Sequence, residues 1–176
     1  MGNIKENRDM GNMTPEHREV MDNLVALTRM QLKNSLCFSM REAKYSWDED
    51  RDENGNPNRR EPDFSILCGV RKRKNLIYTD VPRFVAEVLS DSTEKEDRGS
   101  KMDLYLKIGV EEYWIIDPRT LVIERYFLDD DGTRFLLHDT IDRNTDEKKR
   151  QTLSPLLFPH LMIPFDDIFM GVGTDQ

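Results

Sequence analysis

The sequence predicts an α/β (α+β) fold, in which helices pack against a central sheet. Short apolar runs typical of buried strands alternate with segments whose apolar residues recur at helical spacing. The elements follow the order α, β, β, β, α, β, β, β, without internal repeats. A chain of 176 residues has the length of one domain. We place that domain at residues 14–170, between a flexible arm at 1–13 and a tail at 171–176.

The first half of the chain contains one predicted helix and three predicted strands. Thr14 is suited to cap a helix and Pro15 to occupy its first position, so a helix is expected over residues 15–33. The charged stretch 48–60, which contains glycine and proline, predicts an exposed loop. The strands are expected within residues 38–47, 64–70 and 84–89.

The second half is predicted to start with a helix over residues 94–108. Thr93 and Glu96 match a capping box, and Gly109 is suited to end the helix. A strand at 112–116 follows and stops before Pro118. Two more strands are expected on either side of Asp129-Asp130-Asp131-Gly132, which is typical of a hairpin turn. They lie at 121–128 and 133–138.

Composition excludes several classes of protein. The net charge of −8 and the pI near 5.0 argue against a protein that coats DNA through bulk charge. The longest apolar runs are far shorter than the ~20 residues of a membrane span, and no secretion signal opens the sequence. Cys37 and Cys68 make neither a disulfide scaffold nor a zinc site, and His17, His138 and His160 are scattered. A reducing cytoplasm is therefore the expected compartment.

Two carboxylates occupy unusual positions. Asp63 opens the first strong strand, and Glu87 lies inside the apolar run Phe84–Leu89. An unpaired buried carboxylate is costly, so Glu87 requires a cation, a hydrogen-bonding partner or a proton. A structural ion pair, or a place on an edge strand facing water, is the alternative interpretation.

The helix after Glu87 brings a lysine toward the same place. At helical spacing Lys101 shares the sheet-facing side with Asp97 and Tyr105. Lys101 lies about 12 Å along the helix axis, and Glu87 lies about 10 Å back along its strand. If the helix folds over that strand, the two residues are level. An i,i+4 pair with Asp97, stabilising by only a few tenths of a kcal/mol, is the alternative, and both contacts can coexist.

An Asp, a Glu and a Lys at one point suggest Mg²⁺- or Mn²⁺-assisted hydrolysis of a phosphodiester. The carboxylates of Asp63 and Glu87 would hold the ion, with waters left for the reaction. Lys101 would orient the attacking water or offset charge on the phosphorus. Basic residues near the strand that begins at Asp63 could contact phosphates, although any basic loop would look the same. They are Arg59, Arg60, Arg71 and Lys72.

A string of short motifs carries a family resemblance. The motifs are Pro62-Asp63, Glu87-Val88-Leu89-Ser90, Asp97, Lys101, Tyr105, Gly109 to Trp114, and Asp117-Pro118. Together they resemble the Uma-type putative restriction endonuclease family of the PD-(D/E)XK nuclease superfamily, over about residues 15–170. The resemblance implies a restriction-endonuclease-like fold with a mixed central sheet, and Asp63 and Glu87 as metal ligands. Asp97 and Tyr105, on the same helix side as Lys101, are the expected supporting residues.

The position of the lysine departs from the superfamily pattern. The superfamily lysine normally lies two residues after the glutamate, where this chain has Leu89. Lys101 would then be a migrated substitute from the neighbouring helix.

These observations predict a Mg²⁺-dependent DNA endonuclease. Cutting both strands usually takes two copies of a single-site nuclease, and the hairpin at 121–138 offers apolar surface, so a C₂ homodimer is expected. The alternative function is a catalytically inactive nuclease-fold protein that acts as a nucleic-acid-binding or interaction module.

Overall fold

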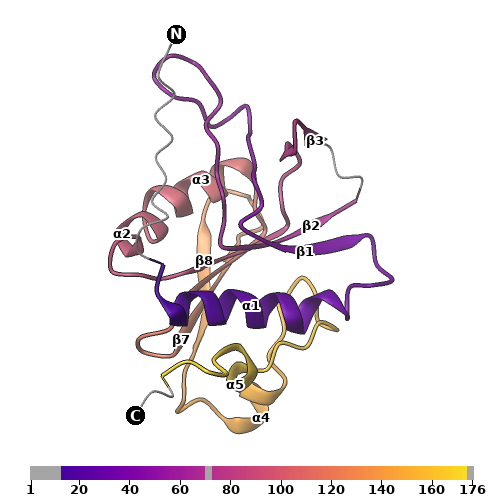
Figure 1. Cartoon of the computed structure of the whole chain (residues 1–176), viewed down its shortest axis with the longest axis vertical. Coiled ribbons are helices and arrows are strands. Elements are labelled where there is room, and N and C mark those ends of the chain that lie inside the picture. Colours follow the sequence, from indigo (N-terminus) through magenta and orange to yellow (C-terminus); the bar gives the residue numbers. More distant parts are fainter. Residues whose placement is uncertain (1–12, 70–72, 174–176) are drawn as a thin grey trace.

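A six-stranded mixed sheet forms the centre of the protein in a computed structural model that describes residues 13–69 and 73–173 (Figure 1). The strand order is β1-β2-β5-β6-β7-β8, and only β5 and β6 run parallel. The strands are β1 Cys37–Arg41, β2 Phe64–Cys68, β5 Phe84–Val88, β6 Glu112–Asp117, β7 Val122–Leu128 and β8 Phe135–Ile141. A separate small hairpin pairs β3 Arg73–Lys74 with β4 Ile77–Tyr78. The predicted fold class is confirmed.

Helices cover both faces of this sheet (Figure 1). On one face α1 Pro15–Arg29 packs with α5 Phe165–Ile168, and α4 Glu147–Gln151 lies beside α5. On the other face lie α2 Glu94–Asp97 and α3 Ser100–Ile108. Within the described part of the chain, none of these helices has the length and apolar character needed to cross a membrane.

The first helix joins the two ends of the described chain. Thr14 caps α1 as predicted, because its hydroxyl accepts a hydrogen bond from the His17 amide at 3.3 Å. Further along α1, the Asn23 side chain donates to the carbonyls of Ile168 (3.0 Å) and Met170 (2.9 Å). Residues 1–12 and 174–176 lie outside the described residues, and with them most of the predicted arm and half of the predicted tail.

The predicted helix over 94–108 is instead two helices. The chain turns at Gly99, where a Cβ atom would lie only 2.9 Å from the carbonyl oxygen of Lys95. The predicted capping box is wrong, since the Thr93 hydroxyl contacts the Ser90 hydroxyl (3.0 Å) and makes no cap bond to α2. Gly109 ends α3 as predicted, in a left-handed conformation with φ of 84°.

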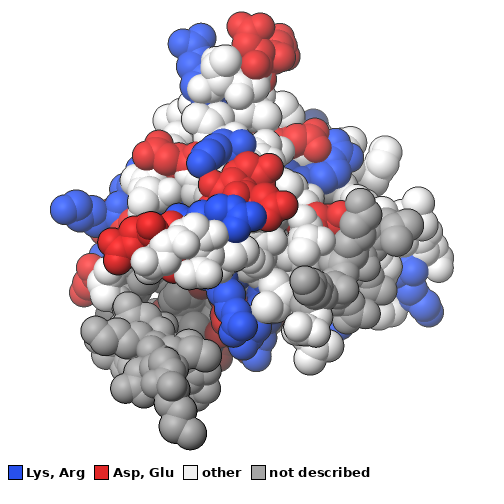
Figure 2. Space-filling view, turned by 90° about the horizontal axis from the view of Figure 1, so that it is seen from above, with Lys and Arg blue, Asp and Glu red and all other residues white. Residues whose placement is uncertain are grey.

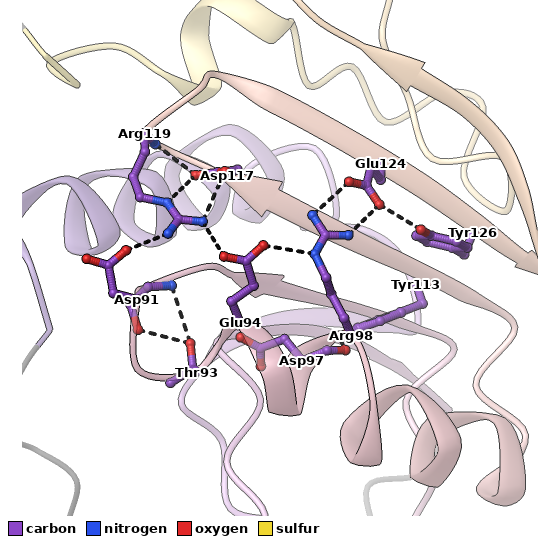
Figure 3. Close-up of polar contacts among 11 residues, drawn as sticks. Asp91, Thr93, Glu94, Asp97, Arg98, Tyr113, Asp117, Arg119, Glu124 and Tyr126 are labelled. Carbon is purple, nitrogen blue, oxygen red and sulfur yellow. Dashed lines mark hydrogen bonds and ion pairs between the residues drawn. The ribbon is translucent and has the colours of Figure 1, made fainter.

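An ion-pair network ties α2 to the strands beneath it (Figure 3). The Arg119 guanidinium contacts Asp117 and Glu94, both at 2.8 Å. Arg98 contacts Glu94 at 3.1 Å and Glu124 at 2.8 Å. Single surface pairs contribute little, but shared partners hold the helix end in one place on β6 and β7. The end of α2 is therefore fixed where Asp97 lies.

A disulfide links the edge strand β1 to β2. Cys37 and Cys68 lie directly opposite each other in the antiparallel register and are bonded. This bond between two cysteines 31 residues apart differs from the expectation that they form no disulfide scaffold. Strand register, which brings residues distant in sequence face to face, accounts for the difference.

Candidate active site

The antiparallel pair β2 and β5 brings Asp63 and Glu87 together. Phe64 pairs with Ala86, so Asp63, just before β2, lies beside Glu87 and Val88 at the end of β5. The amide of Asp63 donates to Glu87 Oε2 at 3.3 Å. The amide of Val88 donates to Asp63 Oδ2 at 2.8 Å. The two carboxylates are thus held to each other's strands.

The helices above β5 add Lys101, Asp97 and Tyr105 to this pair. The Lys101 ammonium lies 3.1 Å from Glu87 Oε2 and 2.7 Å from Asp97 Oδ1, so both contacts considered for this lysine exist together. The Tyr105 hydroxyl donates to Glu87 Oε1. Tyr113 donates its hydroxyl to the Asp97 carbonyl at 2.9 Å, which anchors the end of α2 (Figure 3). The structure therefore brings together all five residues predicted to form or support the site.

Negative charge dominates this cluster. The side chains of Glu87 and Asp97 are 0% exposed, and one lysine, 23% exposed, pairs with both. Burial, together with Asp63 and Asp97, raises the pKa of Glu87 to about 8, against the attraction of Lys101. Burial also raises the pKa of Asp97. Burial alone would lower the pKa of Lys101, but the surrounding carboxylates raise it.

Asp63 has a further neighbour that the sequence analysis did not assign to the site. The Nε2 atom of His17, in the first turn of α1, lies 3.1 Å from Asp63 Oδ2. Burial raises the pKa of Asp63, but His17, the charge of Lys101 and the Val88 amide outweigh it and lower this pKa. One sequence signal was available, because His17 precedes Val20 and Leu24 on the helical stripe that faces the core.

A small cavity opens beside the lysine. It has a volume of about 70 Å³ and is lined by Arg60, Glu96, Ser100, Lys101 and Leu104. Arg60 is held there by the buried Asp50, with 2.6 Å between Arg60 Nε and Asp50 Oδ2. One of the predicted phosphate contacts thus lies next to Lys101. A cavity of this size has room for water molecules beside the ammonium group.

The other predicted phosphate contacts are less defined. Arg59 is exposed on the loop before β2, and Arg71 and Lys72 lie outside the described residues. Figure 2 views the molecule from above Figure 1 and shows Lys and Arg interspersed with Asp and Glu over the described residues of that face, rather than gathered into one stripe. Contact with a polyanion would therefore depend on a few local groups.

The donor set around Asp63 and Glu87 consists of hard oxygen atoms. Among the described residues, no group of three or more His, Cys, Asp or Glu side chains is arranged to hold a metal ion by itself. Mg²⁺, however, is commonly bound by one or two carboxylates together with waters and substrate phosphates. Two carboxylates in an excess of negative charge fit that mode of binding.

Comparisons with known proteins find the same fold in a solved structure. A crystal structure of a "putative nuclease belonging to DUF820" from Anabaena variabilis is similar, with a TM-score of 0.66 and 18% sequence identity. The match covers 89% of this chain and 82% of that one. At this identity the match shows a shared fold, a mixed sheet flanked by helices.

The sequence also identifies the family. The model of the Uma2 family, described as "Putative restriction endonuclease", matches residues 6–163, so the chain belongs to this family. The uncharacterized protein slr1290 of Synechocystis sp. is 37% identical over 78 residues, which make up 44% of this chain and 41% of that protein. The chain thus matches less than half of that relative's length. The predicted family resemblance is confirmed, and the family supports a nuclease.

Proposed function

We propose that this protein is a Mg²⁺- or Mn²⁺-dependent DNA endonuclease whose centre is formed by Asp63, Glu87 and Lys101. The observation that carries the proposal is the buried cluster of three carboxylates with a single lysine. Such a cluster is poorly balanced as a purely structural element, because buried charges need matching partners. A divalent cation held by Asp63 and Glu87 would supply the missing positive charge.

The side chains of the proposed centre have different roles in the reaction. When bound, the metal ion supplies a more acidic water and stabilises negative charge on the phosphate. Glu87 is kept in position by the Tyr105 hydroxyl and the Asp63 amide. Lys101 is fixed by Asp97 and partly exposed at the cavity, where its ammonium group orients a water or offsets charge on the phosphorus.

Arginine side chains would hold the substrate beside this centre. Arg60 lines the same cavity as Lys101 and is oriented by Asp50. A guanidinium matches the geometry of a phosphate, so Arg60 is the first phosphate contact that we propose. Arg59, Arg71 and Lys72 remain proposals from the sequence.

The decisive experiment compares the wild type with Asp63→Ala. The wild type should bind Mn²⁺ in a calorimeter and nick supercoiled plasmid when Mn²⁺ is added, and Asp63→Ala should lose both. A folded Asp63→Ala protein that binds Mn²⁺ as well as the wild type would contradict the site assignment.

A catalytically inactive binding module is the second candidate function. The observation that favours it is Leu89, 1% exposed, at the position where the superfamily lysine normally lies. A wild type that binds DNA in Mn²⁺ but leaves plasmid uncut at high protein concentration would support this second function over the first.

We also propose that the protein acts as a C₂ homodimer through its β7–β8 hairpin. Leu136 and Leu137 on the edge strand β8 are 46% and 54% exposed, beside a hollow of about 560 Å³ that Phe127 and Leu156 also line. Exposed apolar surface of this kind is typical of an association site. Light scattering at micromolar concentration should give the mass of two chains, and Leu137→Asp should give that of one. A monomeric wild type would contradict the dimer.

A further inference from the structure

His17 is a buried polar residue on an otherwise apolar helix face. It is 5% exposed and lies one helical turn before Val20 and Met21, which are fully buried. Its Nδ1 atom has no hydrogen-bond partner among the described residues. A buried polar atom without a partner costs stability, so a leucine or methionine would serve packing better here. Packing alone therefore does not explain a histidine at this position.

The contact that His17 does make is with Asp63. Its Nε2 atom lies 3.1 Å from Asp63 Oδ2, although the N–H direction is not yet aligned for a full hydrogen bond. Next to a carboxylate oxygen, Nε2 is the nitrogen that carries the hydrogen. A rotation of the ring would align this N–H with Asp63 Oδ2.

The same carboxylate oxygen is already engaged from the sheet. Oδ2 accepts the Val88 amide at 2.8 Å, whereas Oδ1 accepts no hydrogen bond from the described residues. Two N–H groups that converge on Oδ2 set the rotation of the carboxylate and leave Oδ1 for a ligand. One of these groups belongs to the backbone of β5, so the His17 side chain is the one that a substitution can remove.

The place of His17 in the fold makes this contact specific. α1 covers the face of the sheet opposite α3, which supplies Lys101 (Figure 1). Asp63 precedes β2 and is reached from both layers, by His17 from α1 and by the charge of Lys101 from α3. The first turn of α1 also carries positive partial charge, which favours a carboxylate nearby.

We propose that His17 is a positioning residue that orients the Asp63 carboxylate for metal binding. This inference rests on the proposed function, and it adds α1 to the parts of the fold that build the site. Partners that hydrogen-bond a metal-ligating carboxylate typically contribute 10- to 100-fold to metal affinity or activity.

The experiment measures Mn²⁺ affinity by calorimetry and thermal stability in the same set of full-length proteins. His17→Leu should keep or raise the melting temperature without metal, because a buried unpaired nitrogen is removed, and should weaken Mn²⁺ binding about 10-fold or more. His17→Gln should restore part of the affinity, since its amide can still donate to Asp63. The Mn²⁺ concentration for half-maximal cleavage should rise in step with the dissociation constant.

Asn23→Leu is the matched control. It removes a buried polar side chain from the same helix, where Asn23 bonds to residues 168 and 170 away from Asp63. It should lower the melting temperature and leave Mn²⁺ affinity at the wild-type value. Should His17→Leu fail to fold, His17→Met and His17→Gln provide the same comparison.

The outcomes separate this inference from the proposed function. Mn²⁺ affinity in the His17 variants equal to that of the wild type overturns the positioning role, as does an equal loss of affinity in Asn23→Leu. Mn²⁺ binding that is absent in the wild type, or unchanged in Asp63→Ala, overturns the proposed function and this inference with it. Loss in Asp63→Ala together with wild-type affinity in the His17 variants overturns the inference alone.

Discussion

Two buried glutamates on neighbouring parallel strands have opposite surroundings. Glu112 on β6 and Glu87 on β5 are both 0% exposed. The carboxylate of Glu112 accepts three neutral N–H groups, from the Trp114 indole (2.7 Å) and the amides of Leu156 (3.1 Å) and Leu157 (3.0 Å). Glu87 instead shares its surroundings with Asp63, Asp97 and Lys101. Glu112 therefore fixes the position of the segment after α4 through hydrogen bonds. Glu87 belongs to a cluster of charged side chains.

Burial of a carboxylate does not by itself identify an active site, because Glu87 and Glu112 are equally buried. Burial raises the pKa of both carboxyl groups. At Glu112 the fixed N–H donors counteract this rise, so the charge is satisfied by the fold itself. At Glu87 two more carboxylates add to the rise and bring the pKa to about 8. Uncompensated charge, rather than burial, distinguishes Glu87, the glutamate that we propose to be functional.

The substitution Glu87→Gln gives the largest expected effect and tests one half of this comparison. Cleavage should fall by about 10³-fold, because one of the two proposed metal ligands is lost. At pH 4, where the carboxyl group is largely protonated in both the folded and the unfolded protein, the free energy of unfolding should change by less than about 1 kcal/mol, since a glutamine resembles the protonated acid. At pH 7 the variant should be more stable than the wild type by about 3 kcal/mol, because it has no proton to take up on folding. Plasmid cleavage and thermal denaturation measure the two quantities.

The pH dependence of stability sharpens the same prediction. The folded protein keeps the Glu87 proton up to about pH 8, whereas the unfolded chain releases it near the ordinary value of 4.5. The contribution of Glu87 to the unfolding free energy therefore falls as the pH rises between these values. Glu87→Gln should remove that fall, and an identical pH profile in both proteins would contradict it.

Glu112→Gln makes the same chemical change on the neighbouring strand. We expect a loss of roughly 3 kcal/mol of unfolding free energy, because the amide group would turn a donor toward fixed N–H groups. Activity per folded molecule should stay within twofold of the wild type. Urea denaturation and cleavage below the unfolding transition measure both. A Glu112→Gln protein as stable as the wild type would break the comparison from its structural side.

Lys101→Met tests the single cation of the charged cluster. If Lys101 serves the reaction, cleavage should fall by roughly 10²-fold. Mn²⁺ binding should be retained or strengthened, because a cation near the metal site has been removed. Circular dichroism must show a folded protein. An active Lys101→Met enzyme would mean that the lysine only pairs with its acidic neighbours.

Asp139→Asn gives the smallest expected effect and concerns the structural region around Glu112. Burial raises the pKa of Asp139, but Arg125 and Lys149 outweigh it and lower the pKa to about 2. Because the folded-state pKa is depressed, its stabilisation is present above about pH 4 and is lost as the pH falls toward 2. Because solvent screens this partly exposed group, we expect the contribution to be about 1 kcal/mol. Acid denaturation of the wild type should show this loss of stability between pH 4 and 2, and Asp139→Asn should flatten the profile in that range.

Much of the fold could be predicted because its signals are local. Thr14 and Pro15 start α1, Gly109 ends α3, and the turn before Gly132 joins β7 to β8. The site residues on β5 and α3 followed from the strand and helix periods, since both elements fold back on each other. Helix ends, tight turns and residue periodicity all depend on residues that are close together in the sequence.

The parts that escaped prediction depend on tertiary contacts. The break falls at Gly99, where the close Lys95 carbonyl leaves no room for a Cβ atom, and the Arg98–Glu124 ion pair holds the end of α2 on the sheet. No motif in the sequence links His17 to the site, because its partner Asp63 lies 46 positions further along the chain (63 − 17). The Cys37–Cys68 bond required the register of β1 on β2.

The hydrogen bonds of Asn23 also have a consequence for the order of folding. They close a separation of 145 residues to Ile168, whereas Lys101 meets Glu87 across only 14. Short separations close at lower entropic cost, so the β5–α3 unit can assemble early and the docking of α5 on α1 comes late. Substitutions at Asn23 should then accelerate unfolding and leave the refolding rate nearly unchanged. The hydrogen bonds between Asn23 and the residues near the C-terminal end of the described chain would thus determine the unfolding rate of the protein rather than its folding rate.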